Sequence, residues 1–241
     1  MRPRDRKLRQ RLQQAREAVA LEAARLLYHG ACKEYIEAKR AAAQKLGINV
    51  LPSNREIAIK LLEYAVLVEG DEYWRRLRRF REEALHLMMI LSSFRPRLVG
   101  SVWRGVIKPS SDIDIELDFT DPEPVRKKLL KEGYQIIEES PIDVPEPLRY
   151  GSLWRIKVKT PAGSRAEVIL KEHEWYVRPP RCDIYGDPKK GLNPVELREV
   201  LEKRPDALFI PSLEGDDGWR WIERPSRSSS HTYTEKWSSG R

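Results

Sequence analysis

The sequence has few of the features that mark secreted or membrane-spanning chains. It contains two cysteines, Cys32 and Cys182, in 241 residues, which excludes a disulfide framework and fits free thiols in a reducing compartment. No apolar run reaches the ~18 residues that a transmembrane helix needs. The basic start, residues 1–16, is not followed by the apolar segment of a signal peptide. These absences predict a cytoplasmic protein without a membrane partner.

Charged and apolar residues, by contrast, are both plentiful. Apolar residues make up 40% of the chain and charged residues 34%, which is typical of a globular protein with a heavily charged surface. The formal net charge is +8, and the whole excess lies in residues 1–95, because residues 96–241 hold as many acidic as basic side chains. The first part therefore suits a polyanion or an acidic partner, or is simply a solvated basic surface.

The first part of the chain has the periodicity of helices. Apolar residues recur at three- and four-residue steps through residues 8–46, which predicts a helix that Gly30 kinks or breaks and Gly47 ends. Ser53–Glu56 has the pattern of a capping box at the start of the next helix. A further helix is predicted over about residues 71–92.

From residue 94 onward the pattern changes to that of strands. Asp112–Phe119 alternates strictly between acidic and apolar residues, which predicts a strand with carboxylates on one face. Leu153–Lys159 and Arg165–Leu170 are predicted to form a hairpin. Further strands are expected at 97–99 and 134–138, and helices at 124–133 and 193–203.

Together these patterns predict an α+β fold in three parts. A basic helical module spans residues 1–70, and a mixed-sheet domain with flanking helices spans residues 71–210. The remaining residues, 211–241, are rich in Ser, Gly and charge, and we expect a disordered tail there.

The acidic face of the predicted strand is the first candidate for chemistry. Asp112, Asp114, Glu116 and Asp118 share that face, and side chains two apart on a strand are roughly 7 Å apart. Such a row needs water, Lys or Arg, or a metal cation to balance its charge. Magnesium suits carboxylate oxygens and also retains phosphate ligands. A solvated strand face, with a calcium ion or with nothing bound, is the alternative.

A possible phosphate site precedes this row. Gly100 follows a predicted strand and permits close backbone approach, while the amide and hydroxyl of Ser101 can hydrogen-bond phosphate oxygens. Arg104 offers a planar fork for phosphate. A phosphate site beside a carboxylate pair that binds two metal ions is what nucleotidyl transfer requires.

These residues resemble a known family signature. Leu98–Gly105 and then Ser111–Ile115, with their Gly-Ser and Asp-x-Asp, are similar to the signature of the DNA polymerase β-like nucleotidyltransferase superfamily, and closest to its minimal nucleotidyltransferase group. The resemblance covers about residues 72–170. It implies a small mixed sheet of the polymerase β type with flanking helices. It also implies transfer of a nucleoside monophosphate from an NTP such as ATP to an acceptor hydroxyl, with release of pyrophosphate.

The resemblance also assigns roles to residues. Asp112 and Asp114 would bind two Mg²⁺ ions, for which Mn²⁺ can substitute. The nucleotide-binding positions would be Gly100, Ser101, Arg104 and Ser111. Trp103 stands where the family often has Ala, which puts the shape of the nucleotide pocket in question.

The family usually supplies a third carboxylate from a later strand. Glu167 matches that position by context, although the family more often has Asp there. A cross-strand salt bridge at Glu167 and a third ligand at Glu116 are the alternatives. If the hairpin pairs polar face with polar face, Arg155 and Lys157 lie beside Glu167.

The acceptor is left open by the sequence. RNA, including a tRNA end, or a protein hydroxyl is favoured because the first half is basic, and a small antibiotic alcohol is a further alternative. A binding module with this fold but without turnover, such as an antitoxin, is the alternative outside the enzymes.

Overall fold

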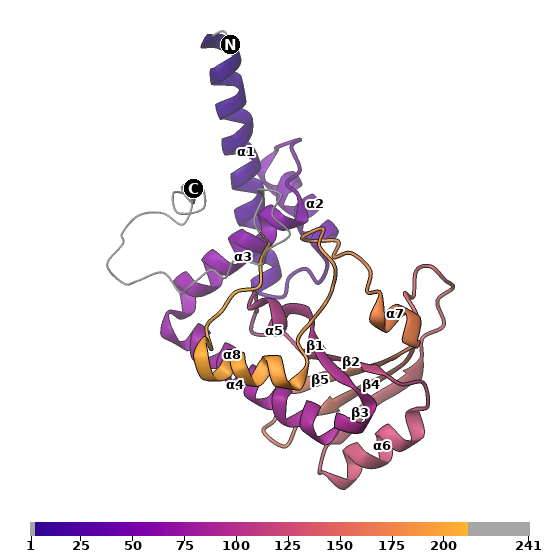
Figure 1. The fold of residues 1–241 in the computed structure, drawn as a ribbon. Coiled ribbons are helices and arrows are strands. Elements are labelled where there is room, and N and C mark those ends of the chain that lie inside the picture. The colour runs from indigo at the N-terminus through magenta and orange to yellow at the C-terminus, as the bar shows by residue number, and fades with distance from the viewer. Residues whose placement is uncertain (1–2, 212–241) are drawn as a thin grey trace.

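The computed structural model describes residues 3–211, and the predicted tail therefore lies, except for Pro211, outside the described residues. Helices and strands follow one another in an α+β order that joins four N-terminal helices to a five-stranded sheet (Figure 1). The elements are α1 (Pro3–Tyr28), α2 (Tyr35–Leu46), α3 (Asn54–Glu69), α4 (Asp71–Ile90), η1 (Ser92–Phe94), β1 (Pro96–Val99), α5 (Gly100–Arg104), β2 (Ile113–Asp118), α6 (Pro122–Lys131), β3 (Gln135–Pro141), β4 (Ser152–Lys159), β5 (Arg165–Lys171), α7 (His173–Val177) and α8 (Pro194–Lys203).

The N-terminal helices end and begin where the sequence predicts. The long helical pattern is broken at Gly30, which has φ +73° and separates α1 from α2. Gly47 ends α2 in the left-handed conformation. Ser53 and Glu56 form the predicted capping box, since each side chain accepts from the other's backbone N–H.

The sheet is mixed, with the strand order β1-β2-β5-β4-β3. The outer pairs are antiparallel, whereas β2 and β5 run parallel to each other in the interior. The predicted hairpin of β4 and β5 is confirmed, and its register places Lys157 opposite Glu167. The parallel pairing of β2 with β5 could not be predicted, because no short turn joins these strands.

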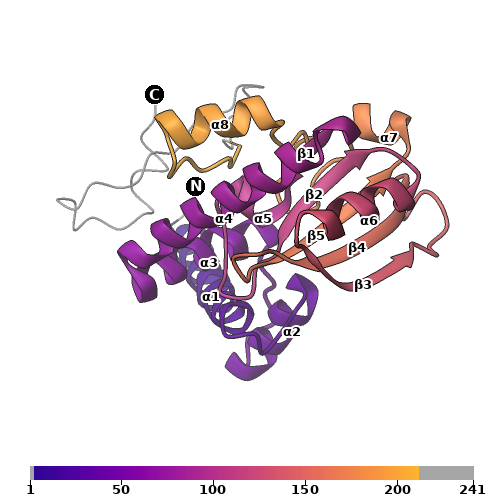
Figure 2. The same cartoon turned by 90° about the horizontal axis from the view of Figure 1, so that it is seen from below.

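Helices cover one face of the sheet. Both α4 and α6 lie against the same face, and α8 runs beside α4 (Figures 1 and 2). Ile113, Ile115 and Leu117 of β2 are fully buried on the face that meets these helices. One cluster of buried residues extends from α1 through α4 into the sheet. The predicted boundary between the helical module and the sheet domain, at residue 70, falls in the turn between α3 and α4. In the described part of the chain, no helix is long and apolar enough to cross a bilayer.

A buried arginine links α4 to two other segments. The Arg81 side chain is completely buried and donates hydrogen bonds to the carbonyls of Val102, Trp103, Pro205 and Ala207 at 2.7–3.2 Å. Burial lowers the pKa of its guanidinium to about 10. Arg81 thereby fixes the position of α5 and of the chain that follows α8.

Replacing Arg81 by Met is expected to lower the free energy of unfolding by about 3–5 kcal/mol, because four buried carbonyls lose their donor at once. Chemical denaturation checks this value. The matched control is Arg78→Met on the exposed side of the same helix, for which we expect a change within about 0.5 kcal/mol. Equal effects of the two substitutions would contradict the structural role of Arg81.

Candidate active site

The carboxylates of β2 lie where the alternation predicts. Asp114 and Glu116 keep part of their surface exposed on the face opposite the buried Ile113 and Ile115. Asp112 precedes the strand and is also partly exposed. The sequence pattern alone thus placed these carboxylates on one face of the sheet.

The turn from β1 into α5 presses directly against Asp114. In the antiparallel pair, Val99 is opposite Asp114, and Gly100 follows with φ +70°. A Cβ atom at Gly100 would lie 2.0 Å from Asp114 Oδ2 and 3.1 Å from Asp114 Cβ. Only glycine therefore allows this backbone to pass so close to the carboxylate.

The parallel pair brings a third carboxylate to the same place. Glu167 on β5 is the register partner of Asp114 on β2, and neighbouring strands are about 4.8 Å apart. On its other side Glu167 is opposite Lys157, and Arg155 Nε lies 3.5 Å from Glu167 Oε1. The prediction that Arg155 and Lys157 lie beside Glu167 is confirmed.

The surroundings of Asp114 disfavour its ionised form. Burial, followed by the neighbouring charges of Glu167, Asp112 and Glu116, raises the pKa of Asp114 to about 8. Burial also raises the pKa of Glu167, although Arg155 and Lys157 oppose that shift. A cation placed among these carboxylates would reduce the repulsion between their negative charges.

Arginine side chains pair with two of these carboxylates. Arg165 Nε donates to Asp112 Oδ1 at 2.8 Å, with side-chain exposures of 58% and 37%, and Arg155 approaches Glu167 as described. Within residues 3–211, no three His, Cys, Asp or Glu side chains are placed so that they hold a metal ion as they stand. The donor set nevertheless suits Mg²⁺, since all its ligands are oxygens. An exposed ion pair contributes only about 0–1 kcal/mol, so Arg165 is readily displaced.

The two serines of the predicted phosphate site lie together. Ser101 Oγ donates to Ser111 Oγ at 3.2 Å, and the backbone N–H of Lys108 donates to the same Ser111 oxygen at 3.0 Å. Both serines keep part of their surface exposed. They close the loop that joins α5 to β2, directly before Asp112.

The side chain of Arg104 does not lie with these serines, and the expectation that it holds phosphate needs correction. Its side chain is buried, forms a two-pronged ion pair with Asp187 at 2.8 and 2.9 Å, and donates to the carbonyl of Phe209. It also lies over the ring of Trp103. The reason is that Arg104, at the end of α5, has its side chain in the protein interior. There it forms the ion pair with Asp187, which lies in a loop distant in sequence.

The far end of the β2 row is neutralised by bases. Glu116 accepts hydrogen bonds from Arg97 and Lys171, whose side chains are buried. Asp118 pairs with Arg95 and His173. Glu116 therefore has a structural ion-pair role, which makes Glu167 the stronger of the two expected third carboxylates.

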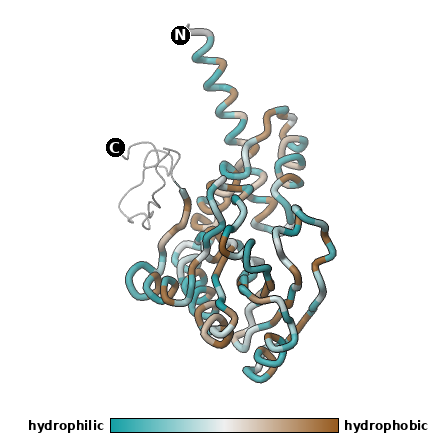
Figure 3. Tube along the Cα trace, turned by 45° about the vertical axis from the view of Figure 1, so that its right-hand side comes forward, coloured by the Kyte–Doolittle hydropathy of each residue, from teal (hydrophilic) through white to brown (hydrophobic). Residues whose placement is uncertain are grey.

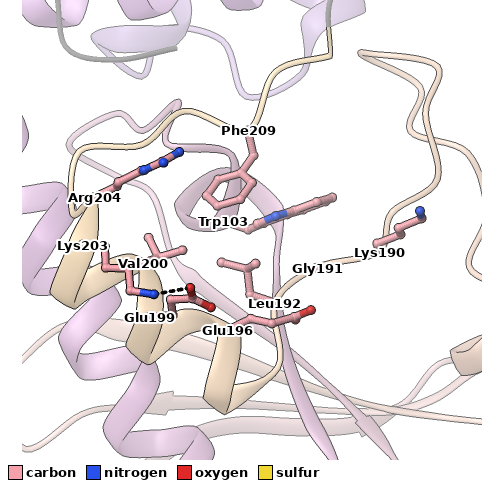
Figure 4. A pocket seen from close by; sticks show the side chains of 10 residues that line it. All are labelled: Trp103, Lys190, Gly191, Leu192, Glu196, Glu199, Val200, Lys203, Arg204 and Phe209. Atoms are coloured by element: carbon pink, nitrogen blue, oxygen red, sulfur yellow. Dashed lines mark hydrogen bonds and ion pairs between the residues drawn. The ribbon is translucent and has the colours of Figure 1, made fainter. Parts of the chain in front are cut away.

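A cavity beside α5 is separate from these carboxylates. It measures about 520 Å³ and has an apolar floor with charged residues around it (Figure 4). None of the carboxylates above lines it, and the side chain of Trp103 does. The lining residues are Trp103, Lys190, Gly191, Leu192, Glu196, Glu199, Val200, Lys203, Arg204 and Phe209.

Sequence reasoning missed Arg165 as a partner of Asp112. The contact depends on the parallel pairing of β2 with β5, for which no sequence signal was found. A scan against protein-family models gives no match to this chain, and neither does a search of curated proteins.

Gly100→Ala is expected to destabilise the protein by about 1–2 kcal/mol more than Gly133→Ala. Both positions have positive φ, but nothing lies within 4 Å of a Cβ at Gly133, so the difference isolates the contact with Asp114. Denaturation of both variants measures it. In an Asp114→Ala background the extra cost of Gly100→Ala should shrink, and an unchanged cost would contradict the contact.

The raised pKa of Asp114 has a consequence for stability. The folded state binds a proton that the unfolded chain releases near pH 4, so stability falls as pH rises toward 8 and is level above it. In chelator, Asp114→Asn should therefore raise the melting temperature, by about 3 °C or more at pH 8.5 and by less at pH 5. The exposed Asp143→Asn is the matched control, and a pH-independent difference for Asp114→Asn would refute the shift.

Proposed function

We propose that the protein is a metal-dependent nucleotidyltransferase of the polymerase β type. The observation that carries this proposal is the convergence of Asp112, Asp114 and Glu167 beside the Gly100 turn, where burial and neighbouring carboxylates disfavour the ionised form of Asp114. Ionising a carboxyl in such surroundings costs stability unless a cation is present. Such a cost is expected at a site built to receive a cation.

The three carboxylates would hold Mg²⁺, or Mn²⁺ in its place. When bound, the metal supplies neutralisation of phosphate charge and activation of the attacking hydroxyl. Asp114 is fixed by the strands on both sides, whereas Asp112 is held by an exposed arginine that can move away. Asp114 therefore provides the rigid ligand and Asp112 the adjustable one.

The chain offers suitable contacts for an NTP next to these carboxylates. Gly100 leaves the backbone open to close approach, and the hydroxyls of Ser101 and Ser111 can donate to phosphate oxygens. Arg165, once released from Asp112, supplies a mobile cation at the same edge. It replaces Arg104 as the candidate base for the triphosphate.

The reaction itself would be a displacement at the α-phosphorus. A bond forms between this phosphorus and the acceptor oxygen, the bond to pyrophosphate breaks, and the acceptor proton is lost to solvent. The chain contributes position and charge rather than a covalent nucleophile. The excess of basic residues over positions 1–95 favours an RNA acceptor, such as a tRNA end, or a protein hydroxyl.

One observation favours a second candidate, a binding protein of the same fold without turnover. Arg165 on Asp112 and Arg155 on Glu167 neutralise two of the three carboxylates without any metal. A protein that never binds a metal would be stabilised by these pairs. Metal dependence separates the two candidates.

Incubation with each of four α-³²P-labelled NTPs, Mg²⁺ or Mn²⁺, and either total RNA or a protein lysate tests the proposal. We expect label on one class of macromolecule, and a loss of about 10²-fold or more in Asp112→Asn/Asp114→Asn, because each substitution removes a metal ligand. Asp143→Asn, an exposed carboxylate away from the site, is the matched control and should retain activity.

The remaining outcomes are also informative. NTP binding that needs Mg²⁺ but gives no label on either macromolecule would indicate a small alcohol as acceptor. No label together with no metal-dependent NTP binding would refute the enzyme and leave the binding protein.

A further inference from the structure

The first half of α1 continues an apolar stripe beyond the body of the protein. Leu8, Leu12, Ala15 and Val19 recur at alternating steps of four and three, which are the d and a positions of a heptad. Val19 is completely buried against the other helices, but Leu8 is 58% exposed and Leu12 47%. Figures 1 and 3 show this end of α1 standing clear of the body.

Arginines flank this stripe on both edges. In the same heptad numbering, Arg9 and Arg16 occupy successive e positions and Arg11 occupies a g position, and all three are exposed. Arg16 lies 3.9 Å from Glu56 of α3, while no ion pair to another described residue is found for Arg9 or Arg11. We call Leu8, Arg9, Arg11, Leu12, Ala15 and Arg16 the heptad face.

A helix whose apolar side chains are exposed to water gains little stability from them. Most helical stability in proteins comes from tertiary packing of an apolar face, and Leu8 and Leu12 leave 58% and 47% of their surface exposed. The apolar stripe and its charged edges are what a second helix requires. The e and g positions of a partner would have to be acidic to match these arginines.

We propose that the heptad face binds an acidic amphipathic helix of a partner protein. A second copy of this chain is a poorer fit, because pairing two such faces would bring arginines opposite arginines. A nucleic acid is also a poorer fit, since the cations lie on both sides of the leucines and would leave these leucines in water. The inference rests on α1 alone and is independent of the proposed activity.

The test measures binding of labelled synthetic helices to the full chain by fluorescence anisotropy. The probe carries three heptads with Leu at a and d and Glu at e and g, and the control probe has Lys at e and g. We expect the Glu probe to bind at least about tenfold more tightly than the Lys probe. Leu8→Gln/Leu12→Gln should weaken binding of the Glu probe about tenfold or more, whereas Leu67→Gln, at an 81% exposed leucine of α3, should not.

A charge reversal completes the test. Arg9→Glu/Arg11→Glu should exchange the preference, so that the Lys probe binds more tightly. The proposal is overturned if the leucine variant binds the Glu probe as the unchanged protein does, or if a single-stranded RNA binds more tightly than the Glu probe and competes for the same arginines. Self-association that disappears in Leu8→Gln/Leu12→Gln would identify a second copy as the occupant and would equally overturn it.

Discussion

The position of α5 depends on a buried guanidinium that donates hydrogen bonds to four backbone carbonyls. Arg81 crosses from α4 to the carbonyls of Val102 and Trp103 and to those of Pro205 and Ala207. A guanidinium in such a place is tolerated because several donors meet acceptors at once. Since α5 begins at Gly100, the same contacts hold the turn that faces Asp114. The geometry of the candidate site therefore begins on a helix outside the sheet.

The second constraint is the register between the two parallel strands. Asp114 and Glu167 are neighbours only because β2 and β5 pair in this register. A shift by one residue would turn Glu167 to the apolar face and bring Val168 to the carboxylates. The buried Ile115, Val168 and Leu170 make such a shift costly. The hydrophobic core on one face thus fixes the polar chemistry on the other.

Local patterns were sufficient to predict most of the elements. The helix break at Gly30, the capping box at Ser53 and the alternation of β2 all depend on neighbours in sequence, and all are present. Contacts between distant segments could not be predicted in this way. Asp187 reaches Arg104 from more than eighty positions away, and Arg165 reaches Asp112 across a strand pair without a turn. The short helix α7 was missed because it has no periodic pattern long enough to detect.

The acidic row of β2 is divided by how its counter-charges are held. Arg97 and Lys171 meet Glu116 from buried positions, where removing either partner would leave an uncompensated charge. Arg165 meets Asp112 from an exposed position, where water can replace it at little cost. The Glu116 end of the row is consequently held in buried ion pairs. At the Asp112 end, another cation can replace the exposed arginine. Asp114 lies at this exchangeable end without a base of its own among the described contacts, so the two ends of the row differ in whether their counter-charges are buried or exposed.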